Sequence, residues 1–250
     1  MIRRFFAAWS FLTIFPSPRF REDQPPYALT RAVPYFPVVG LVLGVLTYLA
    51  ATVLAYWLPS MVAAAVVVAL LAGYSGGLHL DGLADSGDGL LGAHDRQRAL
   101  DIMRDSRIGA YGAMTLAIVL LVKYACLASL GDAIPSVALL APLGGRFAMI
   151  AAMTLLPYAR LSGLGSVFTF SDRFLALGLA FLLLLAGGIV FWGVGRAIAA
   201  MLVCAATAAL WIVFLKIRLG GATGDNYGAA CEFGETAVLL AASALFKPGF

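Results

Sequence analysis

The stretch from residue 32 to residue 80, AVPYFPVVGLVLGVLTYLAATVLAYWLPSMVAAAVVVALLAGYSGGLHL, contains no formally charged residue. A helix needs about 20 apolar residues to cross a hydrocarbon core of about 30 Å, so this stretch is long enough for two membrane-spanning helices. Pro59 and Ser60 divide it near its middle and predict the turn of a helical hairpin. The sequence therefore predicts a helical membrane protein.

The composition of the whole chain agrees with this prediction. Of the 250 residues, 62% are hydrophobic and only 12% are charged, whereas soluble domains carry about 25% charged residues. Further spans are predicted at 109–130, 135–157, 174–194 and 197–215, and a shorter apolar run covers 236–246. We therefore expect an all-α, polytopic protein with six to seven transmembrane helices, in which residues 1–250 form one membrane domain.

The N-terminal segment 1–31 begins with an apolar run that is too short to span a membrane before Pro16. Arg3 and Arg4 without a small-residue cleavage site argue against a cleaved signal peptide. We expect an interfacial or re-entrant helix that stays on the protein.

The distribution of Lys and Arg predicts the orientation, because these residues accumulate in cytoplasmic loops. With the N-terminus inside, 13 of the 17 Lys and Arg residues are cytoplasmic, Arg196 and Lys247 are outside, and Lys123 and Arg146 lie within spans. The polar loops 79–107, 158–173 and 216–235 then share the cytoplasmic face. The basic residues are scattered through loops, so no nucleic-acid partner is expected.

Three aspartates stand close together in the segment HLDGLADSGDGLLG, residues 79–92. Their spacings of four and three residues place Asp81, Asp85 and Asp88 within about 60° of one another around a helix. Three such carboxylates repel one another unless a cation lies among them. Mg²⁺ is bound by one or two carboxylates together with water and substrate phosphates, so Mg²⁺ or Mn²⁺ is the predicted ion. The alternative is a solvated acidic loop.

Glycines accompany these aspartates at positions 82, 87 and 89. Glycine leaves the surface of a helix bare, so we expect Gly82, Gly87 and Gly89 to let a bulky phosphate group approach the carboxylates.

The next segment, RQRALDIMRDSRIGAYG at 96–112, mixes acidic and basic residues. Guanidinium groups bind phosphate with two parallel hydrogen bonds, which makes Arg104 and Arg107 candidate phosphate ligands. Asp105 lies between them and is a candidate base. A surface helix with ion pairs one turn apart explains the same residues.

The segment GGATGDNYGAACEFGE at 220–235 offers Asp225, Glu232 and Glu235 as further ligands or bases. A glycine-rich turn followed by a helix whose N-terminus attracts the two glutamates is an equally good interpretation. His79 is a proton acceptor, a hydrogen-bond donor to phosphate, or a partner in a structural hydrogen bond. Arg146 is a functional candidate because it lies within a span, whereas Lys123 could simply extend to the interface.

Four motifs, taken in order, closely resemble those of the cobalamin synthase family, the adenosylcobinamide-GDP ribazoletransferases. They are GGLHLDGLADSGDGLLG, RALDIMRDSRIGAYGAM, LPYARLSGLGSVF and GGATGDNYGAACEFGE. The resemblance extends to LTIFPSP near the N-terminus and to YFPVVGLVLG at the start of the first span. It therefore covers most of the chain.

This resemblance implies an enzyme of the bacterial inner (cytoplasmic) membrane. Such an enzyme joins adenosylcobinamide-GDP to α-ribazole, or to its 5′-phosphate, and releases GMP with the help of Mg²⁺. It implies metal binding by Asp81, Asp85 and Asp88, a place for Asp225 near the nucleotide or a second metal ion, and contacts from Arg104 and Arg107 to the phosphates. Arg146, a candidate because of its place within a span, is a further predicted substrate ligand. The general base stays open among Asp88, Glu232, Asp105 and His79, and the oligomeric state stays open as well.

Two other functions compete with this one. The D-G-x-x-A-D-x-x-D pattern is similar to that of the CDP-alcohol phosphotransferases, but Asp85 stands where those enzymes have Arg, so a lipid substrate is the second enzymatic interpretation. A transporter is the third, although many transporters show inverted repeats with broken helices near the membrane midplane, and no such repeat is visible here.

Overall fold

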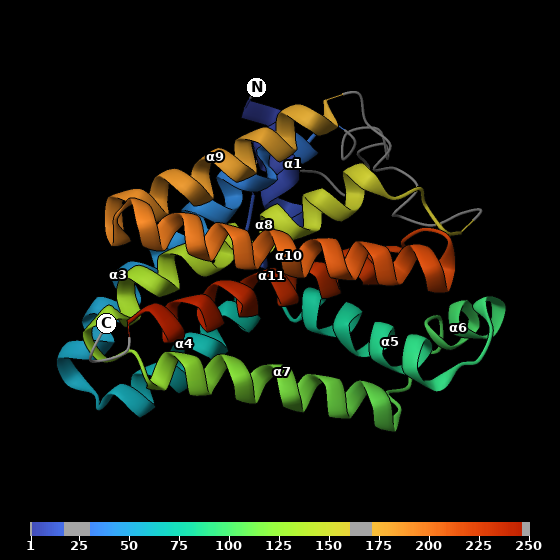
Figure 1. The fold of residues 1–250 in the computed structure, drawn as a ribbon, viewed down its shortest axis with the longest axis horizontal. Coiled ribbons are helices and arrows are strands. Elements are labelled where there is room, and N and C mark those ends of the chain that lie inside the picture. Colours follow the sequence, from blue (N-terminus) through green and yellow to red (C-terminus); the bar gives the residue numbers. More distant parts are fainter. Residues whose placement is uncertain (1, 18–30, 161–171, 247–250) are drawn as a thin grey trace.

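The computed structural model describes residues 2–17, 31–160 and 172–246, and these residues form a bundle of α-helices (Figure 1). Within these ranges no strand occurs, and one isolated bridge joins Tyr158 to Ala222. The elements are α1 (Ile2–Leu12), η1 (Val33–Tyr35), α3 (Phe36–Trp57), α4 (Ser60–Tyr74), α5 (Leu78–Gly92), α6 (Arg96–Ile102), α7 (Ala110–Ala128), η2 (Gly131–Ala133), α8 (Ile134–Leu155), α9 (Arg173–Trp192), α10 (Val194–Leu219) and α11 (Gly224–Leu245).

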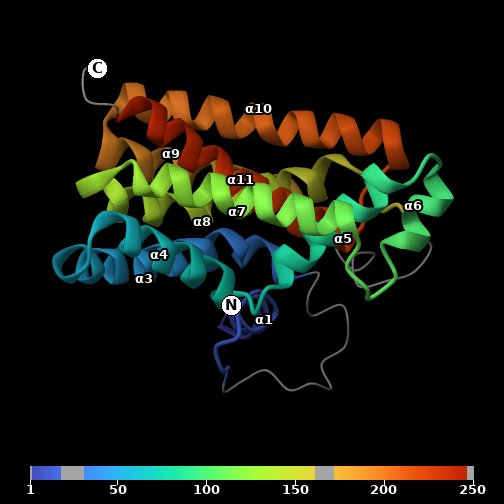
Figure 2. The same cartoon turned by 90° about the horizontal axis from the view of Figure 1, so that it is seen from below.

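Six helical segments of the described chain are long and apolar enough to cross a membrane, and a bent pair makes a seventh. The prediction of six to seven spans is therefore confirmed. The long helices run side by side, and α5 and α6 lie together at one end of the bundle (Figure 2).

The second half of the predicted hairpin differs from expectation. Instead of one continuous span, the chain forms α4, of 15 residues, and then α5, which is set at 88° to α4. The break follows from Gly76 and Gly77, whose φ angles of 61° and 80° are readily adopted only by glycine. The aspartates consequently lie on a separate helix that crosses the bundle.

The end of the chain also differs. The predicted apolar run 236–246 is the second half of α11, a single helix of 22 residues that begins at Gly224. Thr223 starts this helix early because its side chain and that of Asn226 form a reciprocal capping box. The segment 220–235 is therefore mostly helical rather than a loop, and the polar side chains of α11 face its neighbours.

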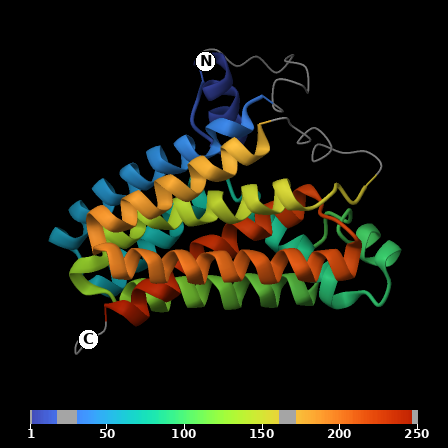
Figure 3. The same ribbon diagram turned by 45° about the horizontal axis from the view of Figure 1, so that its top comes forward.

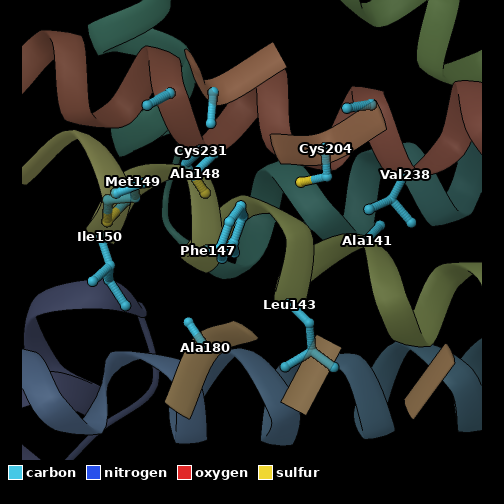
Figure 4. Close-up of a cluster of buried hydrophobic side chains, with 14 of the residues drawn as sticks. Ala141, Leu143, Phe147, Ala148, Met149, Ile150, Ala180, Cys204, Cys231 and Val238 are labelled. Carbon is cyan, nitrogen blue, oxygen red and sulfur yellow. The ribbon is translucent and has the colours of Figure 1, made fainter. Parts of the chain in front are cut away.

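The core is built around α8, and the most apolar stretch of 18 residues in this span is completely buried. Close crossings of small residues allow this packing: Gly144 of α8 meets Gly234 of α11, where either added Cβ would collide with the facing backbone carbonyl. Figure 4 shows apolar side chains on both sides of α8: Leu143 lies on the side of Ala180, whereas Cys204, Cys231 and Val238 of neighbouring helices lie on the opposite side.

Gly40 and Gly44 of α3 contact α8 in the same way. A Cβ at Gly40 would lie 3.2 Å from the carbonyl oxygen of Pro142, and one at Gly44 would overlap that of Leu139. The two glycines thus form a packing seam between helices. The N-terminal helix α1 stands out from one side of the bundle (Figure 3) and buries Ala7, Ala8 and Leu12 against it.

Candidate active site

The helix that carries the aspartates is held closely against α11. An added Cβ at Gly82 would lie 2.6 Å from the carbonyl oxygen of Asp225, and one at Gly228 would lie 3.3 Å from the backbone of His79. These glycines let the backbones of α5 and α11 approach each other. This approach brings Asp225 next to the acidic face of α5. The sequence alone could not establish that the two segments meet.

The expectation that the glycines of α5 leave space for a phosphate group is wrong. Gly82 faces α11, Gly87 faces Thr115 and Tyr111 of α7, and Gly89 faces Met103. Each glycine is therefore covered by another part of the chain. Their physical role is to set the position of α5, and with it the position of the carboxylates.

Asp81 and Asp85 lie one turn apart on α5, with Asp81 exposed and Asp85 half-buried. The carboxylates of Asp225, Asp81 and Asp88 repel a negative charge on Asp85, whereas the guanidinium of Arg160 attracts it. Arg160 forms an ion pair with Asp225, with 3.1 Å between guanidinium nitrogen and carboxylate oxygen. The cluster is thus strongly acidic, with one arginine at its border.

Arg160 is positioned by a short backbone pairing. The N–H of Ala159 donates to the carbonyl of Ala222 at 2.8 Å, and the N–H of Ala222 donates to the carbonyl of Pro157 at 2.9 Å. This pairing joins the chain after α8 to the chain before α11. We did not predict Arg160 as a site residue, although its place directly after a span, in LPYARL, was the available signal.

Two hollows adjoin the cluster, and Asp81 lines both of them. The smaller hollow, of about 250 Å³, lies between α1, α5, α8 and α11 and includes His79, Arg160 and Asp225. The larger hollow, of about 740 Å³ and more open, lies between the end of α1, the break before α5 and the start of α7, and it includes Asp85 and Ser106. The acidic cluster therefore stands between two candidate binding sites.

Asp88 has a different environment from the other two aspartates of α5. Its two oxygens accept hydrogen bonds of 2.7 Å from the backbone N–H groups of Gly109 and Gly112, at the N-terminus of α7. Any side chain at either glycine would overlap this carboxylate. Asp88 therefore caps α7 and stabilises its N-terminal dipole. Its predicted part in metal binding or catalysis stays a prediction.

Arg104, Asp105 and Arg107 lie in the exposed segment between α6 and α7. The guanidinium of Arg107 binds the carboxylate of Asp105 at 2.6 Å, which lowers the pKa of Asp105 to about 2. A carboxylate with so low a pKa accepts protons poorly, so this geometry disfavours Asp105 as a general base. Ser106 of the same segment lines the larger hollow, and neither arginine is among its lining residues.

Four charged side chains are buried together between α7, α8 and α11. Lys123 lies 2.6 Å from a carboxylate oxygen of Glu232 and equally close to one of Glu235. Arg146 donates a hydrogen bond of 2.7 Å to the sulfur of Cys231. Lys123 therefore does not extend to the interface, and neither glutamate lies at the N-terminus of its helix. Glu232 and Arg146 contribute to neither hollow, so their predicted roles in catalysis and substrate binding have no support in this arrangement.

Of the four predicted bases, His79 is the one that lines a hollow described above. It is 3% exposed and lines the smaller hollow beside Asp81. Its Nε2 atom is buried and has no hydrogen-bond partner among the residues that the structure describes. Because buried polar atoms are nearly always hydrogen-bonded, this nitrogen is available to a ligand group.

The donor chemistry of the cluster suits Mg²⁺ held jointly with a substrate. In the described ranges, no group of three or more His, Cys, Asp or Glu side chains is arranged to hold a metal ion by itself. Asp81 and Asp85 together nevertheless provide the one or two carboxylates that Mg²⁺ uses when phosphate and water complete its coordination.

These features define a polytopic helical membrane protein with a cluster of acidic side chains between two hollows. The family model for cobalamin-5-phosphate synthase matches residues 4–243, and the chain belongs to that family. A relative from Desulfitobacterium hafniense (strain Y51), named adenosylcobinamide-GDP ribazoletransferase, is 37% identical over 99% of both chains. A relative of the same name from Roseiflexus sp. (strain RS-1) is 40% identical over 96% of this chain and 89% of its own. No solved structure matches the chain.

Proposed function

We propose that this protein joins adenosylcobinamide-GDP to α-ribazole, or to its 5′-phosphate, and releases GMP. The observation that carries the proposal is the meeting of Asp81 and Asp85 with Arg160 and Asp225 between two hollows. Such a site suits two substrates that react at a phosphate group. The nearly full-length similarity to relatives that carry this name supports the substrate assignment. A CDP-alcohol enzyme and a transporter have no comparable support.

The reaction needs one bond to form and one to break. The ribose hydroxyl oxygen of α-ribazole attacks the phosphorus that bears the cobinamide arm, and the bond from this phosphorus to the oxygen bridging to GMP breaks. His79 Nε2 accepts the proton of the hydroxyl as the new bond forms. The guanidinium of Arg160 binds phosphate oxygens and offsets the charge that develops on the leaving GMP.

Asp81 and Asp85 would hold Mg²⁺ at this point. When bound, the ion supplies charge neutralisation on the diphosphate and orientation of the attacking and leaving oxygens. Asp225 orients Arg160 through their ion pair.

The same proposal includes the location of the site. The Lys and Arg distribution supports a bacterial cytoplasmic membrane protein whose N-terminus and site face the cytoplasm. Of the loop 158–173, residues 161–171 lie outside the described residues.

The experiment that tests this function measures GMP release from purified protein supplied with adenosylcobinamide-GDP, α-ribazole and Mg²⁺. We expect GMP and a corrinoid product in equal amounts, and a large decrease of both in Asp81→Asn at the same Mg²⁺ concentration. Asp132→Asn, at the opposite end of the bundle in η2, is the matched control and should keep full activity. Absence of GMP from the wild-type protein with any divalent metal would overturn the proposal.

A further inference from the structure

The smaller hollow has two chemically different walls. Phe11 of α1 and Met149 and Met153 of α8 provide an apolar wall, whereas His79 and Asp81 belong to a polar wall on α5. Met149 and Met153 are 2% and 6% exposed and belong to the core of the bundle. A ligand of this hollow must therefore have an apolar part and a polar part.

The size of the hollow limits which substrate group it can accept. Drug-sized ligands occupy pockets of about 300–1,000 Å³. A hollow of about 250 Å³ has room for a group the size of a nucleoside. A corrin macrocycle with its side chains is far too large for it. Three nucleoside groups take part in the proposed reaction. The adenosyl group is attached to the corrinoid itself, which leaves the guanosine of the GDP group and α-ribazole as the candidates for a separate hollow.

The chemistry of the apolar wall distinguishes between these two nucleosides. The edge of guanine carries several hydrogen-bond donors and acceptors, which would stay unpaired against thioether and phenyl groups. The base of α-ribazole is a benzimidazole with two methyl groups and no exocyclic donor. Methionine side chains adapt to the shape of such a base and make favourable contacts with aromatic rings. The apolar wall therefore matches the base of α-ribazole.

The polar wall matches the ribose of the same nucleoside. His79 Nε2, buried and without a partner in the described residues, offers an acceptor for a hydroxyl group. Asp81 lines this hollow and the larger one, so a ribose in the first hollow borders the place where the second substrate would lie. The larger hollow of about 740 Å³ is open enough for part of a larger substrate.

We propose that the hollow between Met149, Met153 and His79 is the binding site for the acceptor nucleoside, with its benzimidazole base against the two methionines. This proposal rests on the proposed function, because it assigns one of that reaction's substrates to one of its two hollows. It makes Met149 and Met153 determinants of specificity for the base.

Kinetics of the Met153→Ala variant test the assignment. Loss of apolar contact should raise the KM for α-ribazole by about 10-fold or more, while the KM for adenosylcobinamide-GDP stays unchanged. Met201→Ala is the matched control, because Met201 is 5% exposed and lies on α10 away from both hollows. Met153→Gln, of nearly the same size, should act in the same direction and guards against a folding defect in the alanine variant. A rise in the KM for adenosylcobinamide-GDP alone would overturn the assignment.

A binding titration separates this proposal from the proposed function. Purified protein in detergent is titrated with α-ribazole alone, without corrinoid or metal. We expect binding to the wild-type protein and to Met201→Ala, and weaker binding to Met153→Ala. Equal affinity of all three proteins, or no binding to the wild-type protein, would overturn the nucleoside site. A wild-type protein that binds α-ribazole but releases no GMP would instead refute only the proposed reaction.

Discussion

The guanidinium of Arg160 and the carboxylate of Asp225 lie 3.1 Å apart and join the chain after α8 to the first turn of α11. The side chain of Arg160 is largely buried, with 13% of its surface exposed. Arg160 lines the smaller hollow together with Asp81 and Asp225, so it is the arginine that borders the acidic cluster on that side.

Replacement of Arg160 should therefore impair catalysis strongly. Arg160→Met should lower kcat/KM by about 100-fold, since it removes a cation that faces the developing phosphate charge. Arg160→Lys should retain part of the activity, because lysine keeps the charge but not the two parallel hydrogen bonds. Steady-state GMP release measures both variants. Arg196→Met is the control, since Arg196 lies over the ring of Phe246 at the opposite end of the bundle. Full activity in Arg160→Met would contradict the role assigned to Arg160.

Asp88 and Asp81 should differ in their response to metal. Asp88→Asn removes part of the cap of α7, so we expect a loss of about 1 kcal/mol in stability and no change in the Mg²⁺ concentration that gives half-maximal activity. Asp81→Asn should raise that concentration sharply. Titrations of activity with Mg²⁺ and thermal unfolding in detergent measure the two effects. An equal rise in both variants would identify Asp88 as a ligand.

Loss of the buried lysine should destabilise the bundle. Lys123→Met leaves Glu232 and Glu235 without their cation in a buried site, which should cost about 3–5 kcal/mol of unfolding free energy. The triple variant that adds Glu232→Gln and Glu235→Gln should recover much of this loss, because no unpaired charge remains. Lys216→Met, at an exposed position in the last turn of α10, serves as the control. A single variant as stable as the wild-type protein would show that the ion pairs contribute little.

The close crossing of α5 and α11 should tolerate no side chain. Gly82→Ala places a methyl carbon 2.6 Å from the carbonyl oxygen of Asp225, which is too close for van der Waals contact, so the two helices must separate and the acidic cluster must shift. Misplacement of reacting groups by about 1 Å can cost about 100-fold in rate, and we expect a loss of that order. Gly178→Ala on α9, where an added Cβ meets no atom within 4 Å, should keep full activity. Equal activity of the two variants would contradict this prediction.

The sequence predicted most of the spans because hydropathy depends only on local composition. It failed at the α4–α5 break, where the apolar run continues through Gly76 and Gly77 although the backbone turns by 88°. It also failed at α11, because the polar residues of this helix resemble those of a loop. These side chains are satisfied by neighbours that are distant in the chain, such as Lys123 for Glu232.

For the candidate site, too, the sequence indicates only local features. The spacing of Asp81 and Asp85 on one helix is a local property and could be read directly. The partnership of Asp225 with Arg160 and the capping of α7 by Asp88 join segments that are far apart in the chain, so spacing alone could not reveal them. The glycines of α5 were misinterpreted because their contacts depend on which helices cross there.

The shortness of α4 also affects the surrounding lipid. Its 15 residues extend about 22 Å, less than the hydrocarbon thickness of about 30 Å. The lipid layer beside α4 would thin to match this length. Asp81 and Asp85 would then lie in a local depression of the bilayer surface, where water enters at a depth that acyl chains occupy elsewhere. A substrate with a polar diphosphate could react there while its bulkier parts stay among the lipid headgroups.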